Sequence, residues 1–138
     1  MALSRSLGLT VLLACSTLVS GNALAQGLRL TGDQEVPPNT STAVGTGSIK
    51  VDADGNVTGS VSAPTLAAGR AAHIHLGAPG QNGPPIITLN GGDIGTWTVP
   101  DGAKLTPSQV QSYKAGNLYV NVHTEAHPGG EIRTQLKP

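Results

Sequence analysis

The chain has 138 residues, and its eight basic side chains balance eight acidic ones. It therefore lacks the basic surplus that a nucleic-acid-binding surface needs, and we expect no nucleic-acid partner. The chain has no phenylalanine, so the core of one domain must come mainly from Val, Ile, Leu and Ala.

The first predicted element is an N-terminal signal peptide over residues 1–25. A basic residue, Arg5, is followed by an apolar stretch at Leu7–Val19 and by small residues just before Gln26. This order is typical of cleaved secretory signals, and the apolar stretch is too short to span a membrane. We therefore expect residues 26–138 to be exported to the periplasm or the medium, with no transmembrane segment.

The single cysteine, Cys15, allows an alternative form of processing. The tetrapeptide at residues 12–15 resembles the lipobox of bacterial lipoproteins, whose cleavage would leave a lipidated Cys15. The apolar run before Cys15 is short and the site at Ala25 is well formed, so the lipoprotein is the weaker alternative. Cleavage after Ala25 removes the cysteine and leaves a mature domain without a disulfide.

Residues 26–138 are predicted to form an all-β domain, an antiparallel sandwich or barrel. Apolar and polar residues alternate over short runs separated by Gly, Pro and Asn, which is typical of such folds. Asp52–Asn56 and Asn90–Gly92 have the composition of turns, and Gly77–Pro85 that of a structured loop. The expected strands cover residues 28–31, 43–51, 57–63, 71–76, 86–89, 94–99, 118–123 and 131–136.

One short helix near residues 107–115 is expected to interrupt the strands. Thr106 is a suitable N-cap, Pro107 fits the first helical position, and Gln109 completes the spacing of a capping box. Gly116 suits the left-handed position that often follows the last turn of a helix.

All four histidines fall in two short segments, His73-Ile74-His75 and His123 to His127. Successive side chains of a strand point to opposite faces, so His73 and His75 share the face opposite Ile74. If the two segments belong to neighbouring strands, up to four imidazoles converge on the face that points away from the core. Imidazoles without a cysteine suit copper(II) or zinc.

The histidines are interpreted as ligands of one metal ion, at His73, His75, His123 and His127. A three-histidine site with water is the nearest variant, because His127 lies in a predicted turn. Copper is preferred over zinc because Cu(II) binds more tightly in a comparable site. An open copper site would support superoxide dismutation, with Arg133 or Arg70 steering the anion, and a closed one would suit copper storage or delivery.

Other readings of these residues are open. The histidines can be polar residues on a solvated strand face of a metal-free module that binds a partner protein. Glu131 and Arg133 share one strand face, and an exposed ion pair between them is favoured over a role of Arg133 toward an anion. Asn121 and Glu125 are expected to orient the imidazoles. The aromatic side chains of Trp97 and Tyr119 are expected to pack at a sheet edge or over the site.

Four motifs in order resemble the CHRD domain family: residues 72–75, 80–84, 118–124 and 128–133. The segment Gly32–Pro37 also looks like the opening motif of that family. The resemblance implies an exported β domain over residues 26–138. In animals the domain accompanies extracellular signalling regulators, so the family implies fold and export more firmly than an activity.

A second resemblance concerns only the histidine segments. A His-x-His strand, a following Gly/Pro/Asn loop and further histidines near the C-terminus look like the copper site of Cu,Zn superoxide dismutases. The mature chain has no cysteine pair for the disulfide of that enzyme and no Asp-rich zinc loop. The analogy therefore implies, at most, a copper-only site at His73, His75, His123 and His127.

Overall fold

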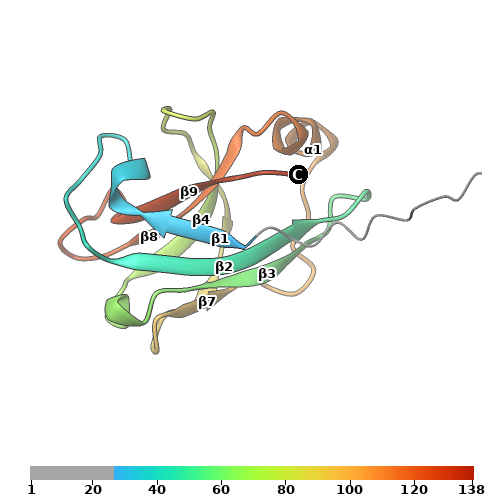
Figure 1. Cartoon of the computed structure of the whole chain (residues 1–138). Coiled ribbons are helices and arrows are strands. Elements are labelled where there is room, and N and C mark those ends of the chain that lie inside the picture. The colour runs from blue at the N-terminus through green and yellow to red at the C-terminus, as the bar shows by residue number, and fades with distance from the viewer. Residues whose placement is uncertain (1–26) are drawn as a thin grey trace, which may run out of the picture.

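The computed structural model describes residues 27–138, where nine strands form one antiparallel sheet (Figure 1). The predicted all-β class is thereby confirmed. The predicted signal peptide and Cys15 lie outside the described residues. The strands are β1 (Leu28–Thr31), β2 (Val44–Val51), β3 (Val57–Ser62), β4 (Ala71–Leu76), β5 (Pro85–Thr88), β6 (Asn90–Gly91), β7 (Thr96–Thr98), β8 (Leu118–His123) and β9 (Ile132–Leu136).

The sheet runs in the order β5-β4-β8-β9-β1-β2-β3-β7-β6 and curls into a nearly closed barrel. The two end strands β5 and β6 are joined by the single residue Leu89, so the two ends of the sheet meet there, and the backbone N–H of Leu89 donates to Ala72 O in β4 at 2.9 Å. The helices are α1 (Pro107–Lys114) and two 3-10 turns, η1 (Gly32–Gln34) and η2 (Pro64–Leu66). No helix within residues 27–138 has the length and apolar character needed to cross a membrane.

Local sequence signals explain two of the connections. The Asp52 carboxylate accepts hydrogen bonds from the backbone N–H groups of Asp54 and Asn56, which fixes the predicted turn between β2 and β3. The capping box of α1 is confirmed, because the Thr106 hydroxyl accepts from Gln109 N and the Gln109 side chain accepts from Thr106 N.

The region of residues 90–99 differs from the prediction. Asn90 and Gly91 form β6, so the turn lies further along the chain, where Gly95 N donates to Gly92 O. Ile94 was expected in a strand but lies in this turn, with its side chain 78% exposed. The reason is the positive φ of Gly91, Gly92 and Gly95, which lets three glycines fold the chain more tightly than the apolar pattern suggests.

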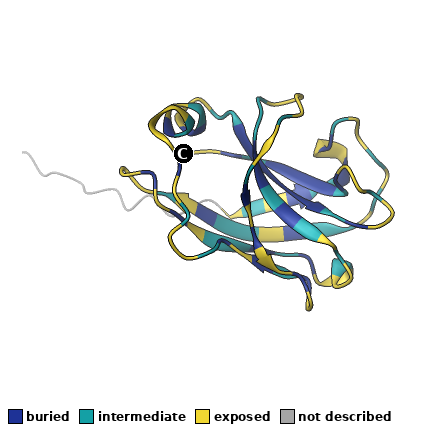
Figure 2. Ribbon diagram, turned by 180° about the vertical axis from the view of Figure 1, so that it is seen from behind, coloured by how far each residue is buried: buried dark blue, intermediate teal, exposed yellow. Residues whose placement is uncertain are grey.

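The core lies inside the curled sheet, and Figure 2 shows exposed residues mainly in the loops. Trp97, expected at an edge or over the site, is instead fully buried in this core. Strand β8, which lies between β4 and β9, is buried on both of its faces. Its inner residues pack in the core, so the outer face of β8 must be covered by loops.

Candidate metal centre

The site is built on two adjacent strands, because β4 pairs with β8 along its whole length. His73 lies opposite Asn121, and His75 lies opposite Tyr119. Side chains alternate along each strand, so Ile74 enters the core while the flanking histidines point to the outer face. His123 lies at the end of β8 on that same face. The predicted neighbourhood of the two histidine segments is therefore confirmed.

Three imidazoles meet on this outer face. The ring centroids of His73 and His123 are 4.8 Å apart, those of His73 and His75 5.6 Å, and those of His75 and His123 5.8 Å. One nitrogen from each ring lies within 4.8 Å of the corresponding nitrogens of the other two. Within residues 27–138 this is the group of His, Cys, Asp and Glu side chains whose geometry could hold a metal ion.

Hydrogen bonds to the backbone orient two of the rings. His75 Nδ1 lies 2.9 Å from Gly83 O, and His123 Nδ1 lies 3.0 Å from Pro128 O. A carbonyl oxygen only accepts, so each Nδ1 must donate its proton, and the neutral ring then carries its lone pair on Nε2. This arrangement of a metal-ligating nitrogen backed by a carbonyl is common around metal sites.

One nitrogen of each of the three rings has no hydrogen-bond partner among the described residues, which indicates a missing ligand. His73 Nδ1, His75 Nε2 and His123 Nε2 are all buried and have no hydrogen-bond partner among the described residues. Buried polar atoms are normally paired, so three orphaned nitrogens in one cluster need an explanation. A metal ion bound at all three would satisfy them together.

Electrostatics keep these rings neutral. Burial is the largest cause that lowers the pKa of His73, His75 and His123 below its ordinary value. The nearby charge of His123 and His75 lowers the pKa of His73 further, since imidazolium ions so close together repel. The histidines therefore offer lone pairs, not protons, at neutral pH, as metal ligation requires.

The loop at residues 77–84 covers the site from above β4. Gly83 packs so closely on the strand that a Cβ there would overlap Leu76 O. The backbone N–H of Leu76 also donates to Pro84 O at 3.0 Å. Only glycine lets the carbonyl of residue 83 approach His75, which explains why the Gly/Pro loop follows the His-x-His strand.

Arg133 and Tyr119 form a stack behind His75. The Tyr119 ring is parallel to His75, with centroids 4.7 Å apart, and the guanidinium carbon of Arg133 lies 3.5 Å from the centre of the Tyr119 ring. Arg133 also donates to Gln81 O at 2.9 Å and to Ala78 O at 3.3 Å. The arginine is only 1% exposed, so it holds the loop at residues 77–84 instead of facing solvent.

Glu35 lies beside the cluster and was not predicted as a site residue. It is 5% exposed, and burial raises its pKa to about 7, although the Asn121 amide and the positive charge of Arg133 oppose this shift. Asn121 lies opposite His73 in the ladder of β4 and β8, and its amide nitrogen and Glu35 Oε1 both come close to Gly130, so Asn121 lies between the carboxyl and the histidine cluster. The only sequence signal was the position of Glu35 in the opening motif of the family.

The remaining predicted residues lie elsewhere. His127 is half-buried in the loop between β8 and β9, and the structure does not group it with the other three histidines. Glu125 forms an exposed ion pair with Arg70 at 3.0 Å and does not orient an imidazole. The expected exposed pair of Glu131 and Arg133 is wrong, because the Glu131 carboxylate accepts from Ser41 and Thr124 hydroxyls.

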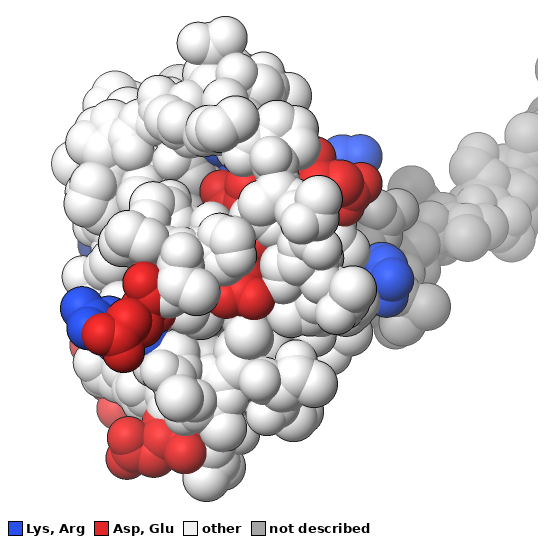
Figure 3. Space-filling model, turned by 90° about the vertical axis from the view of Figure 1, so that its left-hand side faces the viewer, with Lys and Arg blue, Asp and Glu red and all other residues white. Residues whose placement is uncertain are grey.

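Charge is not concentrated on the face drawn in Figure 3, where acidic and basic side chains are scattered among mostly uncharged residues.

Comparison with known proteins agrees with the motif analysis. A family model described as the CHRD domain matches residues 27–136, nearly the whole described domain. Neither the curated proteins nor the solved structures gave a match. The matched range contains β1 to β9 and all three clustered histidines. The chain belongs to the CHRD domain family.

Proposed function

We propose that this is an exported copper-binding protein whose ligands are His73 Nδ1, His75 Nε2 and His123 Nε2. The observation that carries the proposal is the convergence of three buried nitrogens that have no partner among the described residues. Two of the rings have their opposite nitrogen tied to a carbonyl oxygen. The rings are thus oriented in advance for a ligand.

Copper is the metal that this donor set suits best. Three neutral imidazoles bind both Cu(II) and Zn(II), and Cu(II) forms the more stable complexes with a given nitrogen set. His127 is left out of the proposed ligand set because it lies outside the cluster. Three protein ligands leave a coordination position for water or a small substrate.

Superoxide dismutation is the activity that an open copper site of this kind supports. Copper that alternates between Cu(II) and Cu(I) would oxidise one superoxide to O2 and reduce a second, with two protons, to hydrogen peroxide. The rigid strands would hold the three imidazoles through both halves of the cycle. Arg133 would act on the site through Tyr119 and the covering loop, since its guanidinium is buried against both.

Metal titration with a matched histidine control tests the proposal. We expect the purified protein to retain one copper after desalting, and the His75→Ala and His123→Ala variants to lose it. His127→Ala removes a histidine outside the cluster and should retain copper. The electron paramagnetic resonance spectrum of the Cu(II) form should show hyperfine coupling to three nitrogens.

Two outcomes would contradict parts of this proposal. If the protein retains no copper, or if all three variants retain it equally, the metal-free interaction module becomes the better account. If copper binds but the superoxide rate does not exceed that of free copper, the protein is a copper store or carrier without turnover.

Export is a separate part of the proposal. The structure describes only residues 27–138, so the support for export comes from the sequence, in the signal-like pattern over residues 1–25. We expect mass spectrometry of the exported protein to give a mature chain that begins at Gln26. A lipidated chain that begins at Cys15 would establish the alternative processing.

A further inference from the structure

The barrel has a lateral opening between β1 and β9. These antiparallel strands pair at one position only, where Thr31 lies opposite Arg133. Beyond that position β1 pairs only with β2, and β9 pairs only with β8. The edges of residues 28–30 and 134–136 that face each other therefore do not continue the ladder.

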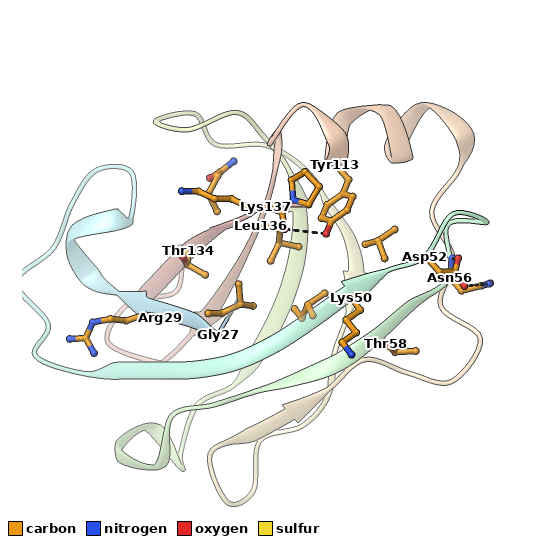
Figure 4. Close-up of a pocket in the computed structure, with 15 residues that line it drawn as sticks. Gly27, Arg29, Lys50, Asp52, Asn56, Thr58, Tyr113, Thr134, Leu136 and Lys137 are labelled. Atoms are coloured by element: carbon orange, nitrogen blue, oxygen red, sulfur yellow. Dashed lines mark hydrogen bonds between the residues drawn. The ribbon is translucent and has the colours of Figure 1, made fainter. Parts of the chain in front are cut away.

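Specific contacts hold this opening in place. The Tyr113 hydroxyl of α1 donates to Lys137 O at 3.1 Å, which ties the end of β9 to the helix (Figure 4). The Gln135 side chain donates to Gly77 O at 2.7 Å and to Gly116 O at 3.0 Å. The end of β9 is thus anchored on the side away from β1, so the gap is a built feature and not frayed strands.

A pocket of about 780 Å3 lies at this opening, within the range of roughly 300–1,000 Å3 found for small-molecule sites. Figure 4 shows Leu136, Tyr113 and Lys50, from β9, α1 and β2, around it. The apolar part of the wall comes from six side chains: Leu28, Ile49, Val51, Tyr113, Leu136 and Pro138. An aliphatic chain placed there would extend the packing of the core outward through the gap.

The charged part of the wall is mainly basic. Three cations line the pocket, Arg29, Lys50 and Lys137, against one acidic residue, Asp52. The Asp52 carboxylate is engaged in the turn between β2 and β3, where it accepts from Asp54 N and from the backbone and side chain of Asn56. The surplus of positive charge around an apolar interior is complementary to an amphiphile with a negative head.

We propose that this pocket binds the free monomer of a single-chain aliphatic carboxylate. The chain enters between β1 and β9 and packs on Leu28, Ile49 and Leu136, and the carboxylate meets Lys50 and the other rim cations. The site is independent of the histidine cluster. Leu136 pairs with Leu118 at the start of β8, whereas His123 lies at the opposite end of that strand and on its other face.

Titration calorimetry with dodecanoate, below its micelle concentration, tests the proposal. We expect one dodecanoate per protein, at least tenfold weaker binding of dodecylammonium, and at least tenfold weaker dodecanoate binding by Lys50→Glu. Lys104→Glu makes the same charge change at an exposed lysine outside the pocket and should bind normally. Leu28→Trp, which fills the opening at a half-buried position, should also lose binding.

Each control separates the proposal from another explanation. Circular dichroism must show that the variants are folded. If Leu28→Trp does not fold, Lys50→Glu still tests the proposal, because Lys50 is an exposed residue whose substitution leaves the core intact. Equal binding of the anionic and cationic amphiphiles, or an equal loss in Lys104→Glu, would overturn the proposal. So would binding only to anionic vesicles. His123→Ala should keep dodecanoate binding, so failure of the copper proposal leaves this result intact.

Discussion

The two faces of β4, β8 and β9 are both covered by other parts of the domain, but they are built from opposite kinds of residue. On the inner face, Ile74, Val120 and Ile132 are almost completely inaccessible to water. On the outer face, His75 is 7% exposed and Arg133 1% exposed, whereas His73 and His123 are half-buried. The inner face is covered by the rest of the barrel, and the outer face by loops.

The difference teaches that burial serves two purposes in this domain. Apolar burial on the inner face stabilises the fold, by about 25 cal/mol for each Å2 removed from water. Burial on the outer face leaves nitrogen and oxygen atoms without partners among the described residues, which costs free energy. Buried polar atoms without partners, gathered in one cluster that loops enclose, are better explained by ligand binding than by folding.

The largest expected effect separates two adjacent residues on opposite faces. Ile74→Ala should lower the free energy of unfolding by about 2–5 kcal/mol, because it leaves a cavity in the core. His73→Ala should change the stability of the metal-free protein far less, since it removes a buried nitrogen that has no partner. Urea denaturation of both variants without metal measures the contrast, and equal losses would show that both faces serve stability alike.

The sequence predicts the strands and the clustering of three histidines because these features depend on local alternation. His73 and His75 share a face in any extended strand, and the register of β4 on β8 then brings His123 to them. The burial of Arg133 and Glu35 could not be predicted. It depends on loops, at residues 77–84 and after β1, which fold back over the sheet from distant positions in the chain.

Trp97 illustrates the same limit in the core. The alternation of apolar and polar residues around Trp97 predicts a strand. Whether that strand lies at an edge depends on how the sheet curls, which the alternation does not show. The sheet continues past β7 only by the two residues of β6, and the near closure of the barrel places Trp97 inside. Strand order and closure are long-range properties, so one sequence does not reveal them.

The second prediction concerns Arg133, which supports the loop that covers the outer face. Arg133→Met should destabilise the protein by about 3–4 kcal/mol, because the carbonyl oxygens of Ala78 and Gln81 lose a charged donor under the loop. Arg133→Lys keeps the charge but lacks the planar fork, so it should recover only part of the loss. Hydrogen exchange should show faster exchange at Gly83 and its neighbours in the methionine variant. Full recovery by lysine would contradict the role of the fork.

The third prediction concerns the buried carboxyl of Glu35. Its folded-state pKa of about 7 exceeds the ordinary value of 4.5, so the folded protein binds the extra proton between these pH values. The contribution of Glu35 to stability is therefore present below about pH 4.5 and is lost as the pH rises through 7.

Above pH 7 the folded protein must hold a buried, charged carboxylate, which costs free energy. Glu35→Gln removes this cost. The variant should exceed the parent protein in free energy of unfolding by on the order of 3 kcal/mol at pH 8, and the excess should vanish toward pH 4.5. The histidines titrate in both proteins, so the difference between the two pH profiles isolates Glu35. A difference that does not change with pH would show that the carboxyl titrates normally.

The smallest expected effect lies at the exposed rim of the outer face. Glu125→Gln breaks the ion pair with Arg70, whose two side chains are largely exposed, so the free energy of unfolding should change by less than about 1 kcal/mol. Copper affinity should not change either, because Glu125 lies on the surface, away from the imidazoles that it was expected to orient. Copper titration and urea denaturation of this variant test both statements. A tenfold loss of copper affinity would mean that the metal centre extends beyond the enclosed cluster into the loop after β8, where His127 would again become a candidate ligand.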